Sequence, residues 1–314
     1  MKIVLLEGLG VPPQVIEKHA QRLAAMGHTF TAYEKDASPA VQLDRSRDAD
    51  VVMLANMPLG LSVVEQAPAL KYIDVAFTGV DHIPMEAAKK RGIQVSNASG
   101  YATQAVAELC IGLMIQLLRK VDATQQRCRQ GGTKDGLVGG LLSGKTVGIV
   151  GAGAIGRRTA ALCKAFGCTV LAYNRSAVQD PAIDRQVPLA ELLEQSDIVS
   201  LHCPLTPETK GLIGREELAR MKKTALLLNT ARGGVVDTPA LADALTQGAI
   251  AGAACDVFEA EPPLPTDHPL LHTPNTIATP HIAFASAESM EQRAEIVFQN
   301  LYAWLEGSPV NLIK

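Results

Sequence analysis

Residues 145–173 constrain the fold of this chain more than any other segment. An apolar, β-branched stretch leads into closely spaced glycines, and a stretch with apolar residues at helical spacing then leads into a second β-branched stretch. The resulting strand, loop, helix and strand are expected at residues 145–150, 151–156, 154–166 and 169–173. A G-x-G-x-x-G pattern alone is common, but this order of elements is the one that a dinucleotide-binding fold requires.

The spacing of the glycines has a physical reason in such a fold. Gly151 permits a tight turn, Gly153 lets the backbone approach a pyrophosphate, and Gly156 lets the helix pack closely on the strand. The first helical amides, at Ala154 and Ile155, would bind the phosphates with the help of the helix dipole. The segment therefore predicts a nucleotide-cofactor domain, and a glycine turn in another kind of α/β protein is the alternative.

Strands also alternate with helices over the rest of the chain. The N-terminal part is expected to form strands at residues 2–6, 29–33, 50–54, 72–76 and 94–96. The C-terminal part is expected to form strands at residues 198–201, 225–229, 251–257 and 276–279, and a long helix at 286–305. Such alternation implies parallel sheets with helices on both faces, so the class is α/β with two doubly wound domains. The first domain has no glycine fingerprint and is expected to bind no nucleotide of its own.

The composition limits the classes of protein to which the chain can belong. A chain of 314 residues is long enough for two domains, and 47% hydrophobic with 19% charged residues is typical of a soluble globular protein. The net charge of -3 gives no reason to expect binding to nucleic acid or a membrane. The six cysteines form no C-x-x-C pair, and no secretion signal precedes the first strand. We expect a cytoplasmic protein without a metal site.

Residues 103–121 form the most strongly helical segment, and its apolar side chains make one wide face. Such a face is either buried in the core or belongs to an arm that crosses to another subunit. Paired glycines at 131–132 and 139–140 indicate a flexible loop before the central strand, and the apolar tail at 310–313 is expected to return to the first domain.

Residues 139–146 match the phosphate-loop pattern G-x-x-x-x-G-K-[ST]. A working phosphate loop follows a strand and opens a helix, so that its amides surround the phosphates. Here the pattern follows a glycine-rich loop and runs directly into a strand. The match therefore does not predict an ATP or GTP site.

Three side chains with catalytic chemistry follow strand ends, where ligands bind in open α/β sheets: Arg232, Glu261 and His281. An arginine holds a carboxylate with a fork of donors that keeps its charge, and a histidine exchanges protons near neutral pH. A carboxylate bonded to the second ring nitrogen would fix the tautomer and raise the pKa of the imidazole. A single histidine after a strand is more often structural, and we interpret His202 in that way.

Several motifs in a fixed order resemble those of the D-2-hydroxyacid dehydrogenase family. They are the glycine loop, HCPLT at 202–206, NTARGG at 229–234, DVFEAEP at 256–262 and TPH at 279–281. The resemblance covers nearly the whole chain. It implies an enzyme that transfers a hydride between NAD(P)H and a small 2-oxo acid, as glyoxylate and hydroxypyruvate reductases do.

The resemblance also assigns roles to individual residues. Arg232 would bind the substrate carboxylate and carbonyl, His281 would exchange the proton, and Glu261 would orient the imidazole. Further cofactor contacts would come from Cys203, Pro204, Thr230, Ala231 and Asp256, the last at the nicotinamide amide. Backbone amides at Thr78, Gly79 and Val80 would hold the substrate carboxylate, opposite a wall at residues 53–59.

The domain order and assembly follow from the same resemblance. Residues 1–98 and 286–314 would form a flavodoxin-like substrate domain, and residues 99–285 an inserted Rossmann domain, with a hinge between them. The family also implies a homodimer with the helix that starts at Thr103 in its interface.

One departure from the family pattern bears on the cofactor. NAD-preferring enzymes carry an acidic residue at the end of the second strand, where it bonds the ribose hydroxyls. Here that position is Asn174, followed by Arg175 and Ser176, which removes repulsion and supplies charge for a 2′-phosphate. We therefore favour NADP(H) and leave NAD(H) open, because an arginine there can instead stack on the adenine.

The substrate is less well defined. Residues 55–59 and 75–78 contain no Arg or Lys, which argues against a phosphorylated substrate such as phosphoglycerate. Phosphite dehydrogenases carry a lysine in the second of these loops, and formate dehydrogenases carry glutamine in place of Glu261. The apolar Met57, Leu59 and Phe77 leave glyoxylate or hydroxypyruvate and a bulkier aliphatic 2-oxo acid open. An NAD(P)-sensing corepressor on the same fold is the alternative of another class.

Overall fold

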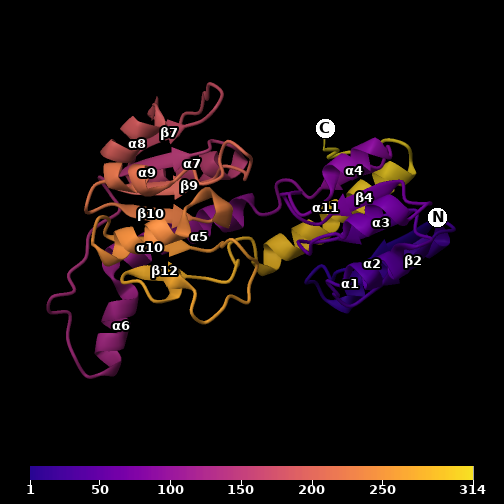
Figure 1. Ribbon diagram of the computed structural model, residues 1–314, viewed down its shortest axis with the longest axis horizontal. Coiled ribbons are helices and arrows are strands. Elements are labelled where there is room, and N and C mark those ends of the chain that lie inside the picture. Colours follow the sequence, from indigo (N-terminus) through magenta and orange to yellow (C-terminus); the bar gives the residue numbers. More distant parts are fainter. Residues whose placement is uncertain (314) are drawn as a thin grey trace. The chain divides into compact units, whose positions relative to one another are not determined.

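The computed structural model describes residues 1–313 and divides the chain into two compact units. Met1–Ala102 and the chain from Ala285 onward form unit 1, and Thr103–Phe284 forms unit 2. Each unit has its own parallel sheet with flanking helices (Figure 1). The predicted fold class, α/β with two doubly wound parallel-sheet domains, is therefore confirmed.

The sheet of unit 1 has the strand order β2-β1-β3-β4-β5, and every neighbouring pair is parallel. The strands are β1 (Lys2–Leu5), β2 (Thr29–Ala32), β3 (Val51–Leu54), β4 (Tyr72–Val75) and β5 (Gln94–Asn97). This is the flavodoxin-like order. Strands β3 and β4 are buried along their whole length, as expected for central parallel strands with both faces covered.

The helices of unit 1 include one from the far end of the chain. They are α1 (Pro13–Ala25), α2 (Pro39–Ser46), α3 (Leu61–Gln66), α4 (Met85–Lys90) and α11 (Ala287–Leu305). Helix α11 places the fully buried Val297, Phe298 and Leu301 in one core with β1 and β3. Each of α2, α3 and α4 is eight residues or shorter and buries only one or two side chains, and the sequence did not predict them.

The chain after α11 returns to the sheet of unit 1, as predicted. Leu312 forms an antiparallel bridge with Ser96, and the amide of Ile313 donates to the carbonyl of Val95 at 2.8 Å. The tail therefore covers the edge strand β5, which reduces the exposed edge of the sheet.

The sheet of unit 2 has the strand order β12-β11-β10-β9-β6-β7-β8, again all parallel. The strands are β6 (Thr146–Val150), β7 (Thr169–Tyr173), β8 (Arg185–Gln186), β9 (Ile198–Leu201), β10 (Leu226–Asn229), β11 (Gly252–Cys255) and β12 (Thr276–Ala278). The chain order reverses between β6 and β9. In open α/β sheets, the crevice at the carboxyl ends of the strands beside such a reversal is where ligands bind.

Helices cover the sheet of unit 2, and one of them was not expected. The helices are α5 (Thr103–Arg119), α6 (Val121–Arg129), α7 (Ala154–Ala165), α8 (Leu189–Gln195), α9 (Arg215–Arg220) and α10 (Thr238–Thr246). Helix α5 buries Val106, Cys110 and Met114 and packs against α7, so this face belongs to the core. Helix α6 buries no residue, and in Figure 1 it extends away from the sheet of unit 2. None of the described helices is both long and apolar enough to cross a membrane.

The phosphate-loop pattern at 139–146 opens no helix. Residues 142–144 form a bend and turn, and the chain then enters β6 at Thr146. The structure thus confirms that the pattern lies in the reversed context, with the strand after it.

A buried carboxyl group links the sheet of unit 1 to α11. Asp74, in β4, is fully buried, and its Oδ1 accepts a hydrogen bond from Nδ2 of Asn300 at 3.1 Å. Its Oδ2 has no hydrogen-bond partner among the described residues. Burial raises the pKa of Asp74 well above its ordinary value, and the bond from Asn300 lowers it only in part.

This raised pKa predicts a loss of stability as the pH rises. Below the ordinary pKa of an aspartate, both the folded and the unfolded chain hold the proton; above it, the unfolded chain releases the proton first and is favoured. Asp74→Asn removes this ionisation. We expect its melting temperature at pH 8 to exceed that of the wild type by about 2–4 °C, with the difference shrinking toward pH 4 in a calorimetric series.

Asp50 provides a control, because its pKa is shifted in the opposite direction and its replacement should change the melting temperature with the opposite sign. Burial tends to raise the pKa of Asp50, but hydrogen bonds from Lys71 and from the amide of Lys2 bring it below its ordinary value. Stability from this group is present above the ordinary pKa and is lost as the pH falls, so Asp50→Asn should lower the melting temperature at pH 8. If Asp74→Asn behaves like Asp50→Asn, the buried carboxyl group is not destabilising.

Candidate active site

The glycine loop of unit 2 tolerates no side chain at two of its glycines. Gly151 has a φ of +96°, and a Cβ there would lie 2.6 Å from the amide nitrogen of Cys203. A Cβ on Gly156 would lie 2.1 Å from the carbonyl oxygen of Gly151. The first glycine is therefore required by the turn, and the last by the close approach of α7 to the loop.

The middle glycine faces open space. A Cβ on Gly153 would meet no protein atom within 4 Å, and no side chain caps the helix that begins at Ala154. The first amides of α7 and the positive end of its dipole are thus available to an anion. These residues fit the pyrophosphate of a dinucleotide.

Asn174, at the end of β7, is tied to the glycine loop. Its Oδ1 accepts from the amide of Ala152 at 3.1 Å, and its Nδ2 donates to the carbonyl and the hydroxyl oxygen of Ser176, both at 3.1 Å. Arg175 is exposed beside it. The side chain at the end of β7 is therefore neutral and already held in place, with a cation next to it.

Arg232 follows β10 in a turn that a buried amide side chain organises. Asn229 is 1% exposed; its Oδ1 accepts from the amide of Ala231 at 3.1 Å, and its Nδ2 donates to the carbonyl of Arg232 at 2.9 Å. The Arg232 guanidinium also donates to the carbonyl of Ala231 at 2.8 Å. The role of Asn229 was not predicted from the sequence, although an asparagine at a strand end is a known turn signal.

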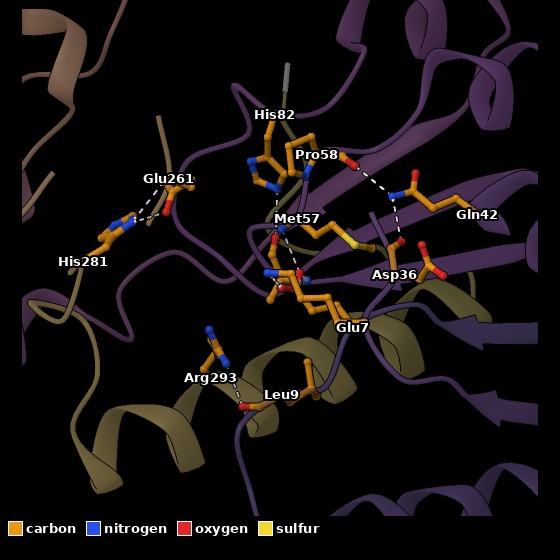
Figure 2. Close-up of polar contacts among 12 residues, drawn as sticks. Glu7, Leu9, Asp36, Gln42, Met57, Pro58, His82, Glu261, His281 and Arg293 are labelled. Atoms are coloured by element: carbon orange, nitrogen blue, oxygen red, sulfur yellow. Dashed lines mark hydrogen bonds and ion pairs between the residues drawn. The ribbon is translucent and has the colours of Figure 1, made fainter. Parts of the chain in front are cut away.

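His281 and Glu261 form a direct pair within unit 2 (Figure 2). The Nδ1 of His281 lies 2.8 Å and 3.1 Å from the two carboxylate oxygens of Glu261. A ring that donates its Nδ1–H to a carboxylate exchanges protons with a ligand through Nε2. The imidazole is mostly buried and also packs edge to face on Phe284, with ring centroids 5.2 Å apart.

The backbone at His281 adopts an unusual conformation that Asp256 supports. His281 has a φ of +56°, in the left-handed region that costs energy for a residue with a Cβ. The carbonyl of Asp256 accepts from the amide of His281 at 2.9 Å, and its carboxylate accepts from the amides of Ile282 and Ala283, both at 2.8 Å. The hydroxyl of Thr279 also donates to this carboxylate at 2.6 Å.

Asp256 therefore holds the turn that presents the imidazole. Its side chain is fully buried, and burial raises the pKa of its carboxyl group while the hydrogen bonds from Thr279 and the turn lower it. The contact with a nicotinamide amide that the family resemblance implied remains a prediction, because the carboxylate already accepts three hydrogen bonds within the protein.

His202 has a structural environment. Its Nε2 lies 2.9 Å from the hydroxyl oxygen of Ser200, and burial lowers the pKa of its imidazole to about 4. The ring is therefore neutral near physiological pH, which fits the structural interpretation made from the sequence.

Residues 78–80 follow β4 in unit 1, at the carboxyl end of that strand. The Nδ2 of Asn97 donates to the carbonyl of Thr78 at 2.6 Å, and the carbonyl of Val80 accepts from the amide of Ile83 at 3.0 Å. The turn is thus held through the carbonyl groups of Thr78 and Val80. Among residues 1–313, no group of three His, Cys, Asp or Glu side chains is arranged to bind a metal ion.

Comparison with known proteins identifies the class. The sequence model of the family described as "D-isomer specific 2-hydroxyacid dehydrogenase, NAD binding domain" matches residues 111–283. A glyoxylate reductase of Korarchaeum cryptofilum (strain OPF8) is 42% identical over 290 residues, which cover 89% of this chain and 87% of that protein. The chain therefore belongs to the D-isomer specific 2-hydroxyacid dehydrogenase family, whose members are NAD(P)-dependent oxidoreductases that act on the CH–OH group of 2-hydroxy acids.

Two further relatives extend over the whole chain. A hydroxypyruvate reductase of Blautia hydrogenotrophica (strain DSM 10507 / JCM 14656 / S5a33) is 35% identical and covers 100% of this chain and 99% of its own. An acyclic imino acid reductase (Bsp5), solved in complex with NADPH and D-Arg, superimposes with a TM-score of 0.92 at 29% identity and full coverage of both chains. These relatives support a nicotinamide-dependent 2-oxo acid reductase and do not favour a corepressor-like protein.

Proposed function

We propose that the chain reduces glyoxylate or hydroxypyruvate with NADPH, and that His281, Glu261 and Arg232 carry the reaction. The observation behind this proposal is the His281–Glu261 pair at 2.8 Å in the unit that also contains the glycine loop. When bound, the nicotinamide supplies the hydride. The protein must then bind the 2-oxo acid, orient it and deliver one proton.

Each residue has a task that its chemistry suits. The permanently charged Arg232 binds the substrate carboxylate and polarises the carbonyl, with the amides of Thr78, Gly79 and Val80 as additional donors. His281 donates the proton from Nε2 to the developing alkoxide and removes it in the reverse direction. The Glu261 carboxylate accepts the Nδ1–H of the ring and thereby holds the imidazole in one tautomer and orientation.

We assign the remaining cofactor contacts to residues around the reversal of strand order. Gly151, Gly153, Ala154, Ile155 and Gly156 would bind the pyrophosphate through the backbone. Further contacts would come from Cys203, Pro204, Thr230, Ala231 and Asp256, at the ends of strands β9, β10 and β11.

A small substrate is favoured over a bulky aliphatic one. The apolar side chains that left a bulkier substrate open are all buried: Met57 is 0%, Leu59 4% and Phe77 6% exposed. Side chains buried to this extent present little apolar surface to a ligand. Relatives named glyoxylate reductase and hydroxypyruvate reductase agree with this preference.

Replacing the proton donor tests the catalytic assignment. His281→Gln keeps a hydrogen-bonding side chain but cannot shuttle a proton, so we expect kcat for hydroxypyruvate reduction to fall by about 10²–10⁴-fold. The affinity for NADPH, measured by fluorescence titration, should stay within about twofold. His202→Gln is the matched control and should retain most of the activity. A His281→Gln variant with wild-type turnover would refute the assignment, and a corepressor would show no turnover in any variant.

The cofactor preference can be measured separately. We expect kcat/KM to be higher with NADPH than with NADH, because neutral Asn174 and cationic Arg175 accept a 2′-phosphate. Asn174→Asp adds a charge that repels the phosphate and bonds the ribose hydroxyls, so it should reverse the preference by about tenfold or more. A wild type that prefers NADH would show that Arg175 does not bind the 2′-phosphate of NADPH.

We also propose a homodimer formed through residues 121–141. Helix α6 buries no side chain, and Val121, Val138 and Leu141 are 43%, 75% and 68% exposed. A cleft of about 340 Å³ lies beside this segment, lined by residues of α5, α6 and the start of β12. Exposed apolar side chains beside an open cleft are typical of an interface between copies.

Light scattering tests the dimer. The wild type should elute at twice the mass of one chain, and Val138→Asp with Leu141→Asp should convert it to a monomer, because charges in an apolar interface are costly to bury. Val310→Asp, a change at an exposed valine of unit 1, should leave the dimer intact. A dimer that persists in the double variant would place the interface elsewhere.

A further inference from the structure

A buried carboxylate in unit 1 takes no part in the chemistry proposed above. Glu7 follows β1 and is only 5% exposed. Glutamate is rarely buried to this extent unless its charge is paired and its oxygens accept hydrogen bonds. Its contacts therefore indicate what the charge is needed for.

Glu7 accepts hydrogen bonds and also forms an ion pair, and only the ion pair is exposed to solvent. The Oε2 of Glu7 accepts from the amide of Ala55 at 3.0 Å and from the amide of Met57 at 2.8 Å. Its Oε1 pairs with the Nζ of Lys35 at 2.7 Å, but the Lys35 side chain is 57% exposed. The solvated ion pair contributes little, whereas hydrogen bonds from buried amides to a charged acceptor are strong. The main task of Glu7 is thus to hold residues 55–57.

Two further side chains hold the same loop, which connects β3 to α3. The Nε2 of His82 donates to the carbonyl of Ala55 at 2.8 Å, and the carbonyl of His82 accepts from the amide of Leu59 at 3.1 Å. Gln42, which is 1% exposed, donates to the carbonyl of Pro58 at 3.0 Å and accepts from the amide of Gly60 at 2.8 Å. Figure 2 shows Glu7, His82 and Gln42 around this loop.

The hydrogen bonds to Glu7 determine which side chains of residues 55–59 are buried and which are accessible to a ligand. Because Glu7 draws in the amides of Ala55 and Met57, these two residues lie in the core, at 3% and 0% exposure. Asn56 between them is half-buried, and Pro58 is exposed. Although the loop has no regular secondary structure, its side chains are thus divided between the core and the solvent-exposed surface.

The loop also lies next to the carboxylate-binding turn of the proposed function. Strands β3 and β4 are parallel neighbours, with Leu54 paired to Val75, so the segments that follow them leave the sheet at the same edge. The bond from His82 to Ala55 joins these two segments directly. A shift of residues 55–59 would therefore alter the surroundings of residues 78–80.

We propose that Glu7 is a positioning residue for the substrate: its buried carboxylate holds residues 55–59 in the conformation that receives the 2-oxo acid. This inference rests on the proposed function, because it assumes that the turn at 78–80 binds the substrate carboxylate. Glu7 touches neither substrate nor cofactor and acts through the loop. Its loss should weaken substrate binding more than it slows the chemical step.

Three variants separate the roles of the acceptor and of the charge. Glu7→Ala removes both hydrogen bonds, and we expect KM for hydroxypyruvate to rise by about 10–100-fold, with a smaller change in kcat. Glu7→Gln keeps an oxygen that can accept from both amides, so its KM should return to within about threefold of the wild type. Lys35→Ala removes only the exposed ion pair and should match the wild type.

Measurements on the folded protein exclude a trivial loss of structure. The affinity for NADPH, which depends on the glycine loop of unit 2, should be the same in all variants. Amide hydrogen exchange should accelerate at Ala55 and Met57 in Glu7→Ala but not in Lys35→Ala, because only the former frees these amides.

The outcomes distinguish this inference from the function it rests on. An active wild type together with an unchanged KM in Glu7→Ala would overturn the positioning role and leave the dehydrogenase intact. Equal damage in Glu7→Gln, Glu7→Ala and Lys35→Ala would assign the effect to the ion pair and also overturn it. A wild type that reduces no 2-oxo acid would overturn the proposed function itself, and the substrate role of Glu7 with it.

Discussion

Backbone amides beyond the carboxyl ends of parallel strands need acceptors that no neighbouring strand supplies, and this requirement organises the protein. Within the sheets, the carbonyl groups of one strand accept hydrogen bonds from the amides of its neighbour. Beyond the strand ends, buried side chains act as the acceptors. Glu7 accepts two amides after β3, Asn229 folds the turn after β10, and Asp256 accepts two amides after β12. These acceptors are themselves buried, so each turn is fixed to the core of its own unit.

Burying a carboxylate for this purpose is costly, and the structure shows how the cost is offset. Asp256 accepts three hydrogen bonds, and Glu7 accepts two and pairs with Lys35. Asp74 receives only one and leaves an oxygen without a partner among the described residues. Burial raises the pKa of its carboxyl group, as it does for Asp256. Burial thus makes ionisation of both aspartates costly, and the hydrogen bonds that they accept offset this cost only in part.

Much of the fold and of the candidate site could be predicted from the sequence. The glycine loop, the described strands other than the two-residue β8, and the helices α5, α7 and α11 have strong local signals, because glycine spacing and apolar period act over a few residues. The His281–Glu261 pair followed from motif resemblance, and the structure brings these two side chains together. The helices α2, α3, α4 and α6 were missed; each is nine residues or shorter and buries at most two side chains.

The sequence by itself determined the α/β class, the nucleotide loop and the family, because these depend on local order and on residues that a given chemistry requires. Only the tertiary structure decided which polar residues hold the turns. Glu7 and Ala55 are 48 positions apart, and Asp256 and Ala283 are 27 apart, so no local pattern links them. Such pairs meet because parallel strands end at a common edge, and that edge exists only after the sheet has formed.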